Sequence, residues 1–168
     1  MKTRFRFQLL QPGQKDLLLK WLSQPHIREW LHGKGLANLL KNLDNYFAGK
    51  TDCRHWIGYE GSVPFSYLLT SPEGEDGITL DLFICEPSFL GKGLSVQMIR
   101  EFLSAHFADK KKVFIDPEAS NARAIHVYQK AGFRIIGEFI APWHPVPHYQ
   151  MVLEMKTLLT ESPVPEAD

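Results

Sequence analysis

The chain has 168 residues, of which 44% are hydrophobic and 12% aromatic, so it is long enough and apolar enough to fold around a core. Its 19 basic and 19 acidic side chains cancel, which gives no general attraction to nucleic acid or to an anionic membrane surface. No apolar run is long enough to predict a membrane span, and the charged N-terminus does not resemble a signal peptide. The spacing of Cys53 and Cys85 indicates neither a disulfide framework nor a metal site. We therefore expect a cytoplasmic globular protein with no nucleic-acid or membrane partner.

The first part of the chain predicts one strand and then helices. Alternating apolar and polar residues indicate a half-buried strand over residues 4–10. Gly33 and Gly35 interrupt the helical pattern that follows. Apolar residues at helical spacing predict helices over residues 14–22, 27–31 and 36–47.

The rest of the chain predicts most of the strands and two further helices. A polar, acidic loop is expected over residues 71–77, and a disordered tail over residues 161–168. One helix is expected to begin after the glycine turn at residue 93 and to end at about residue 107. A second helix is expected over residues 121–131. The strands are expected over residues 55–59, 63–70, 79–85, 112–115, 133–141 and 149–155.

One strand-to-helix junction suggests a ligand, because the strand over residues 79–85 leads through Gly91 and Gly93 into a helix. Two glycines let a ligand approach the backbone, and the N–H groups of a first helical turn suit a phosphate. An ordinary turn would explain the same glycines. Val96 stands where a dinucleotide site needs a third glycine, and the Ser or Thr of a Walker loop is missing. A pyrophosphate loop for coenzyme A is the remaining interpretation.

Three motifs carry a resemblance to a known family. Residues 90–94, LGKGL, are similar to the coenzyme A loop of the GNAT-superfamily acyltransferases, and residues 116–133, DPEASNARAIHVYQKAGF, are similar to its second signature. A third stretch resembles the N-terminal, substrate-side segment of the aminoglycoside 6′-N-acetyltransferases. It contains Trp21-Leu22, His26-Ile27 and Glu29-Trp30. The chain thus resembles a GNAT N-acetyltransferase over nearly its whole length, and within that superfamily an aminoglycoside 6′-N-acetyltransferase.

The resemblance implies an α/β (α+β) GNAT fold. This is a central mixed, mostly antiparallel twisted sheet flanked by helices, with a V-shaped split between the two central strands. It implies one acetyltransferase domain over residues 1–160, and acetyl-CoA as co-substrate without a metal. Phe89 departs from the family pattern, since the superfamily loop usually has Gln or Arg there, so one side-chain contact near the phosphates is missing. Cofactor-binding residues are expected at Leu82, Phe83, Ile84, Leu90, Gly91, Lys92, Gly93, Leu94, Asn121 and Ala124.

Two residues are candidates for catalysis. Asp81 lies inside an otherwise apolar strand, where a carboxylate is costly unless it is exposed, paired or functional, so it is the candidate base or amine-orienting acid. A solvent-facing strand residue is the alternative. Tyr128 has a neutral hydroxyl that can donate a proton to the departing thiolate, although a helical tyrosine often only packs against a core. Asn121 would donate to the pantetheine amide as well as cap its helix, or only cap it.

The acceptor amine is expected to meet residues from several segments. The substrate-binding candidates are His26, Glu29, Trp30 and Asp81. A polycationic acceptor could also be attracted by Glu73, Glu75 and Asp76, which are otherwise simply solvated. His144 and His148 are expected in a loop that covers the site, and without an acidic companion they make a weak metal signal.

The sequence therefore predicts an acetyl-CoA-dependent N-acetyltransferase that moves the acetyl group directly to a primary amine of a small molecule. An aminoglycoside-type polyamine is the leading acceptor, which implies a role in antibiotic resistance. A siderophore hydroxylamine acyltransferase and a protein N-acetyltransferase are the alternatives within the superfamily, and an acyl-CoA-binding sensor module is the alternative outside catalysis. The presence of both Asp81 and Tyr128 favours an enzyme. A monomer or a homodimer is expected.

Overall fold

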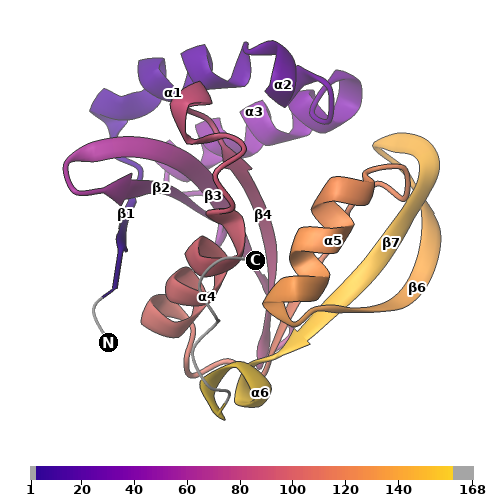
Figure 1. The fold of residues 1–168 in the computed structure, drawn as a ribbon. Coiled ribbons are helices and arrows are strands. Elements are labelled where there is room, and N and C mark those ends of the chain that lie inside the picture. The colour runs from indigo at the N-terminus through magenta and orange to yellow at the C-terminus, as the bar shows by residue number, and fades with distance from the viewer. Residues whose placement is uncertain (1–2, 161–168) are drawn as a thin grey trace.

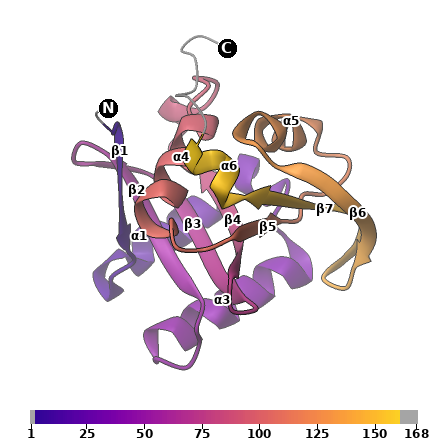
Figure 2. The ribbon, with the colours of Figure 1, turned by 90° about the horizontal axis from the view of Figure 1, so that it is seen from below.

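The computed structural model describes residues 3–160, so the tail expected over residues 161–168 lies outside the described residues. A single seven-stranded sheet runs through the molecule in the order β1-β2-β3-β4-β5-β7-β6 (Figures 1 and 2). The strands are β1 (Phe5–Leu9), β2 (Arg54–Glu60), β3 (Val63–Glu73), β4 (Gly77–Ile84), β5 (Lys112–Ile115), β6 (Arg134–Ala141) and β7 (His144–Glu154). Every neighbouring pair is antiparallel except β4 and β5, which are parallel. The predicted mixed, mostly antiparallel sheet is confirmed.

Helices cover both faces of the sheet. The helices are α1 (Lys15–Leu22), α2 (Pro25–Arg28), α3 (Gly33–Phe47), α4 (Ser95–His106), α5 (Ala122–Ala131) and α6 (Met155–Thr160). Figure 1 shows α1, α2 and α3 together above β2, β3 and β4, with α4 below them and α5 beside β7. No helix within residues 3–160 is both long and apolar enough to cross a membrane.

Two apolar clusters hold these layers together, and they follow the alternation of side chains along the strands. Leu80 of β4 belongs to the cluster under α4, together with Met98 and Phe102 of that helix. Cys85 belongs to the cluster under α1–α3, and Phe83 packs against it. Asp81 is in phase with Phe83 and Cys85, so β4 directs its carboxylate toward the α1–α3 side of the sheet.

The sheet is split at its centre. The parallel strands β4 and β5 pair only at Gly77–Thr79 of β4, with Lys112–Phe114 of β5 as partners. Beyond this point β4 pairs with β3 alone, and Figure 1 shows β4 and β7 diverging on either side of α5. The predicted V-shaped split is therefore confirmed, and residues 80–84 present an edge without a strand partner.

Several boundaries differ from the prediction. The acidic loop is shorter, because β3 continues to Glu73 and β4 begins at Gly77. The two early glycines do not interrupt α3 but form its first turn, which begins at Gly33. Helix α6 was not predicted; its residues Met155 and Leu158 are buried at the end of the chain that the structure describes.

The predicted histidine loop is wrong, because β7 already begins at His144. The prolines of this segment suggested a loop, but Pro147 pairs with Ile140 of β6. The Pro147 carbonyl accepts the N–H of Ala119 at 2.9 Å, so its backbone groups face away from β6. A proline there removes no hydrogen bond from the β6–β7 ladder.

Candidate active site

A cavity of about 440 Å³ lies where β4 and β5 diverge. It is walled by residues from α3, β4, α5 and β7 and from the segments that follow α2 and β5. Of the residues predicted from the sequence to lie at the site, the cavity lining contains Trp30, Asp81, Leu82, Phe83, Asn121, Ala124, Tyr128, His144 and His148. The fold thus brings both catalytic candidates and part of the expected cofactor set into one space.

The free edge of β4 offers backbone groups to a ligand. Cys85 donates its N–H to the Phe65 carbonyl at 2.8 Å, so residues in phase with Cys85 direct their backbone groups toward β3. Leu82 and Ile84 are out of phase and direct their N–H and C=O groups away from β3, to the free edge. An extended chain with amide groups can add to such an edge as another strand would. Leu82 and Ile84 therefore fit the arm of coenzyme A through their backbone, whereas Phe83 does not.

The glycine loop has the open backbone that a pyrophosphate needs. Gly91 and Gly93 have φ angles of +70° and +67°, and a Cβ atom added to either would meet no atom within 4 Å. Glycine is favoured here by the left-handed backbone, and the space above the loop is open. Leu94 precedes α4 and has no capping side chain, so the first helical turn can use its N–H groups for an anion. Leu90 is not free in this way, since its N–H donates to the Pro87 carbonyl at 3.1 Å.

Phe89 serves the core and not the loop. Its ring stacks on Phe65 with centroids 4.6 Å apart and an interplanar angle of 21°. The side chain that the superfamily usually directs to the phosphates is replaced by an apolar contact, and the backbone donors of the loop are unaffected. The loop, the first turn of α4 and the β4 edge together fit coenzyme A.

Helix α5 supplies the opposite wall of the cavity. Asn121, Ala124 and Tyr128 are spaced by three and four residues, so they lie on one face of the helix and all three line the cavity. The Asn121 Oδ1 atom accepts the N–H of Ala124 at 3.2 Å, which confirms the predicted cap. This arrangement leaves the amide NH₂ group of Asn121 as a donor toward the cavity.

Asp81 is the carboxylate at the centre of the cavity. Its side chain is exposed to solvent through the open cavity, although the cavity walls are close enough to desolvate the carboxylate in part. Burial raises the pKa of Asp81, and the charge of Asp116 raises it further, to about 7. A carboxyl with a pKa near neutrality is suited to accept a proton from an ammonium group.

Tyr128 lies within the electrostatic reach of Asp81. Burial raises the pKa of the Tyr128 hydroxyl, and the negative charge of Asp81 raises it further. The hydroxyl is therefore protonated at neutral pH and available as a donor. Its ring also packs against Phe133, with centroids 6.0 Å apart, so a packing role and a donor role coexist.

Asp116 was missed by the sequence-based prediction. It follows β5, lines the cavity, and has one buried carboxylate oxygen, Oδ1, without a hydrogen-bond partner among the described residues. Burial raises its pKa, while the nearby His148 lowers it. Its position directly after a strand that pairs with β4 was the available signal, since parallel neighbours bring the residues after them to one edge of the sheet.

The remaining predicted acceptor residues are separated by the structure. Trp30 lines the cavity, whereas His26 and Glu29 are not among its described lining residues. His26 turns instead to β4, with its Nε2 atom 3.0 Å from the Ile84 carbonyl oxygen. Trp30 is therefore the member of this group that fits a contact with the acceptor.

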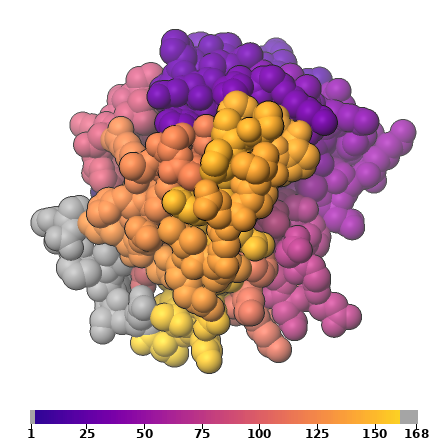
Figure 3. All heavy atoms as spheres, turned by 90° about the vertical axis from the view of Figure 1, so that its right-hand side faces the viewer, coloured from indigo at the N-terminus to yellow at the C-terminus, as the bar shows by residue number. Residues whose placement is uncertain are grey.

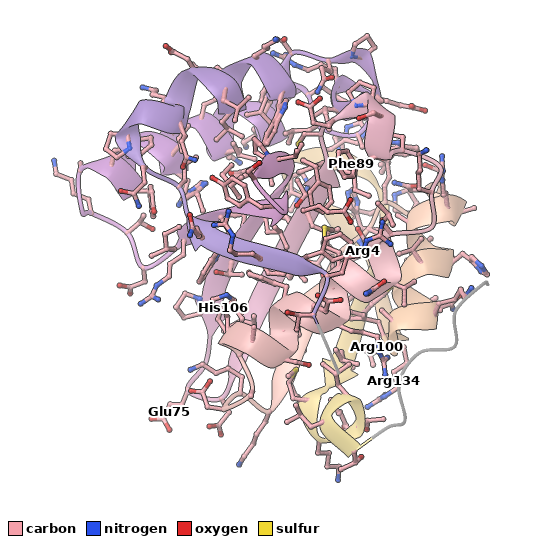
Figure 4. All side chains as sticks on the ribbon, turned by 60° about the vertical axis from the view of Figure 1, so that its left-hand side comes forward. Arg4, Glu75, Phe89, Arg100, His106 and Arg134 are labelled. Atoms are coloured by element: carbon pink, nitrogen blue, oxygen red, sulfur yellow. The ribbon has the colours of Figure 1, made fainter. Side chains whose placement is uncertain are left out.

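The acidic turn lies outside the cavity lining, although Glu73 is near enough for its charge to raise the pKa of Asp116 beyond the effect of burial. Glu73, Glu75 and Asp76 are not among the described lining residues, and Asp76 pairs with Lys111 at 3.5 Å. Figure 4 shows Glu75 at the tip of the molecule, far from helices α1–α3. Any attraction that these residues exert on a cation acts over a distance and is weakened by salt.

The β6–β7 hairpin closes one side of the cavity. His144 and Trp143 line it, and the His144 ring meets His32 edge-on with centroids 4.9 Å apart. A Cβ atom on Gly35 would lie 3.4 Å from the Trp143 ring, so the small residue allows the hairpin to approach α3. Figure 3 shows the hairpin against the N-terminal helices. Within residues 3–160, no group of three or more His, Cys, Asp or Glu side chains is arranged to hold a metal.

Comparison with known proteins identifies the family. The model of the family described as "Acetyltransferase (GNAT) domain" matches residues 14–141, about three quarters of the chain.

The chain belongs to the GNAT acetyltransferase family.

Similar GNAT proteins include several aminoglycoside acetyltransferases. A solved aminoglycoside N(6′)-acetyltransferase from Legionella pneumophila is 53% identical, with a TM-score of 0.91 over 96% of this chain and 98% of that one. The aminoglycoside N(6′)-acetyltransferase type 1 of Klebsiella pneumoniae is 29% identical over 156 residues, which cover 82% of this chain and 78% of the relative. A solved aminoglycoside acetyltransferase AAC(6′)-Ib in complex with coenzyme A and kanamycin is 25% identical, with a TM-score of 0.77 over 94% of this chain and 99% of that one. The predicted family and fold are confirmed.

Proposed function

We propose that this GNAT protein is an aminoglycoside 6′-N-acetyltransferase that uses acetyl-CoA. The observation that carries the proposal is the placement of Asp81 and Tyr128 in one cavity beside the free edge of β4. The aminoglycoside N(6′)-acetyltransferase of Legionella pneumophila, 53% identical over nearly the whole chain, supports the choice of acceptor. Acetylation of an aminoglycoside removes one of its cationic amines, which accounts for the expected role in antibiotic resistance.

The protein would hold the two substrates on different elements. The N–H groups of the glycine loop and of the first turn of α4 would bind the pyrophosphate, and the edge of β4 would bind the pantetheine arm. Acetyl-CoA supplies an acetyl group activated as a thioester. Asp81 and Asp116 provide negative charge for the acceptor, and Trp30 and Trp143 provide flat walls beside it. Because acetyl-CoA and the acceptor are held by different elements, the acceptor amine is fixed next to Asp81.

Asp81 would act on the acceptor as base. An ammonium group must lose a proton before its nitrogen can attack, and Asp81 accepts that proton directly or through one water. Backbone N–H groups at the free edge of β4 can polarise the thioester carbonyl. As the new C–N bond forms and the C–S bond breaks, the Tyr128 hydroxyl gives its proton to the sulfur, and the resulting tyrosinate takes the second proton that the acylated nitrogen must lose.

The coupling between Asp81 and Tyr128 favours this order of events. Burial raises the pKa of Tyr128, and the charge of ionised Asp81 raises it further, so the hydroxyl is protonated at neutral pH. Once Asp81 has accepted the proton of the acceptor, that charge is gone and the pKa of Tyr128 falls. Tyr128 thus becomes a better acid at the stage when the thiolate leaves.

Release of free thiol from acetyl-CoA tests the proposal. The purified protein would be assayed with an aminoglycoside, a hydroxylamine-bearing lysine derivative and a peptide with a free N-terminus. Of the three acceptors, we expect only the aminoglycoside to cause rapid release of free thiol. Faster release with either other acceptor would assign the protein to siderophore synthesis or to protein acetylation. Thermal stabilisation by acetyl-CoA with no release would indicate a sensor module.

The proposed reaction also fits a cytoplasmic location. Cys53 and Cys85 are free thiols, as is usual in a reducing compartment.

A further inference from the structure

Three side chains from α1, α2 and the turn between them bind the last residue of β4 and the two residues that follow it. His26 Nε2 lies 3.0 Å from the Ile84 carbonyl oxygen, and Gln24 donates to the Cys85 carbonyl at 2.7 Å. Trp21 donates its indole N–H to the Glu86 carboxylate at 2.8 Å. Because a carbonyl oxygen only accepts, the Nε2 atom of His26 carries the proton in this contact.

The segment that carries His26 is firmly held. Pro25 occupies the first turn of α2, and Ile27 is buried in the cluster under α1–α3. Arg28 donates from Nε to the Leu22 carbonyl at 2.6 Å, which ties α2 to α1. The imidazole of His26 is thus presented to β4 from a fixed support.

His26 differs from Gln24 and Trp21 because the residue that it bonds lies within β4, which ends at Ile84. The N–H of Cys85 faces β3, since it donates to the Phe65 carbonyl, so the backbone groups of Ile84, one residue earlier, face the free edge. The imidazole therefore lies on the edge that the pantetheine arm would use. It occupies the Ile84 carbonyl and leaves the Leu82 carbonyl as the acceptor for an arriving amide N–H.

This contact bears on the register of the arm. An amide chain that adds to a strand can slide by two residues, which moves it by about 6.6 Å along the strand. A slide of that size would displace the thioester from Asp81. The Ile84 carbonyl has two lone pairs, but the imidazole bonded to it stands on the same edge and disfavours pairing one step further along β4.

We propose that His26 is a positioning residue that fixes the register of the pantetheine arm on β4. The proposal rests on the proposed function, since it assumes that the arm binds to this edge. His26 does not touch the reacting atoms in this scheme; it acts by removing an alternative acceptor from the edge.

Two variants and one matched control test the proposal. His26→Ala frees the Ile84 carbonyl, and we expect kcat to fall roughly 10- to 100-fold, as small misplacements of reacting groups do. The KM for the acceptor and the affinity for coenzyme A in calorimetry should change less than threefold. His26→Gln places an amide N–H at a similar reach and should restore most of the rate. Gln24→Ala removes the equivalent bond one residue further on, at the Cys85 carbonyl beyond the end of β4, and should leave kcat within twofold.

A binding measurement completes the test without relying on turnover. In the wild type, coenzyme A should slow hydrogen exchange of the Leu82 and Ile84 amides, and in His26→Ala the pattern of protection along β4 should change while binding persists. Equal loss of kcat in Gln24→Ala and His26→Ala would overturn the proposal in favour of a simple structural contact, as would normal kcat and normal protection in His26→Ala. Binding of coenzyme A to the wild type without protection of either amide would overturn the proposed cofactor edge itself, and a wild type that does not bind coenzyme A would overturn the proposed function.

Discussion

Asp116 acts on Asp81 across the split between β5 and β4. Burial raises the pKa of Asp81, and the charge of Asp116 adds to that effect and brings the pKa to about 7. Asp81 lies in β4 and Asp116 directly follows β5, and these parallel strands pair for three residues and then separate. The split therefore places a second acidic group near the candidate base, and no hydrogen bond joins the two carboxylates in the described part of the chain.

The pH dependence of the reaction should reveal this interaction. Asp81 works as a base when it is ionised, so kcat/KM should rise as the pH increases through about 7. Asp116→Asn removes the neighbouring charge, which lowers the pKa of Asp81 and should move the midpoint of the rise to lower pH. Glu75→Gln, at the exposed β3–β4 turn, is the control. An unchanged midpoint in Asp116→Asn would show that the two carboxylates do not interact.

The raised pKa of Asp81 should also lower the stability of the folded protein as the pH increases. The pKa of Asp81 is raised from 3.8 to about 7, so between these values the folded protein binds more protons than the unfolded chain. This residue therefore contributes less to stability as the pH rises through that window. We expect Asp81→Asn to have a higher Tm than the wild type at pH 8 and an equal Tm near pH 4, in calorimetric scans. A variant less stable than the wild type at pH 8 would contradict the raised pKa.

Replacement of Tyr128 separates proton donation from packing. Tyr128→Phe keeps the ring that packs on Phe133 and removes only the hydroxyl. We expect kcat to fall about tenfold or more while the affinity for coenzyme A holds. Tyr149→Phe, on a partly buried ring of β7 that is not among the cavity-lining residues, is the control and should leave kcat unchanged. A loss of Tm with normal turnover in Tyr128→Phe would assign the residue to packing alone.

The glycine loop can be tested with a control of equal strain. Gly93→Val should weaken coenzyme A binding by more than tenfold, or about 1.4 kcal/mol, because a side chain enters the space where the ligand meets the backbone. Gly49 has the same left-handed backbone, with φ +70° against +67°, and also has no atom within 4 Å of an added Cβ. Gly49→Val should therefore lose similar stability and bind coenzyme A normally in calorimetry. Equal affinities of the two variants would place the pyrophosphate elsewhere.

Local sequence patterns predicted the strands that have clear alternation or apolar runs. The strand over residues 112–115 agrees with β5 at both ends, and the cap at Asn121 was predicted from its residue type and position. The start of β7 could not be predicted, because Pro145 and Pro147 disfavour a strand in general. Only the pairing partners show that the Pro147 backbone faces away from β6.

Candidate site residues could be named from the sequence where one motif contains them, and were missed where distant segments meet. Asp81 and Tyr128 each stood out within a single stretch, as an acid in an apolar strand and as part of a long signature. The interaction of Asp116 with Asp81 depends on how β4 and β5 pair. The contact of His26 with Ile84 joins residues 58 positions apart, and no local pattern indicates it.

The central claim is that Asp81 is the base for an aminoglycoside amine. The most direct measurement is the steady-state rate of acetyl transfer to an aminoglycoside by the wild type and by Asp81→Asn, with acetyl-CoA affinity measured in parallel. Asparagine keeps the shape of the side chain and removes its charge. We predict that kcat/KM falls by roughly 10²- to 10⁴-fold in the variant and that acetyl-CoA binds as in the wild type. Full activity in Asp81→Asn would remove the residue from the mechanism and contradict the account.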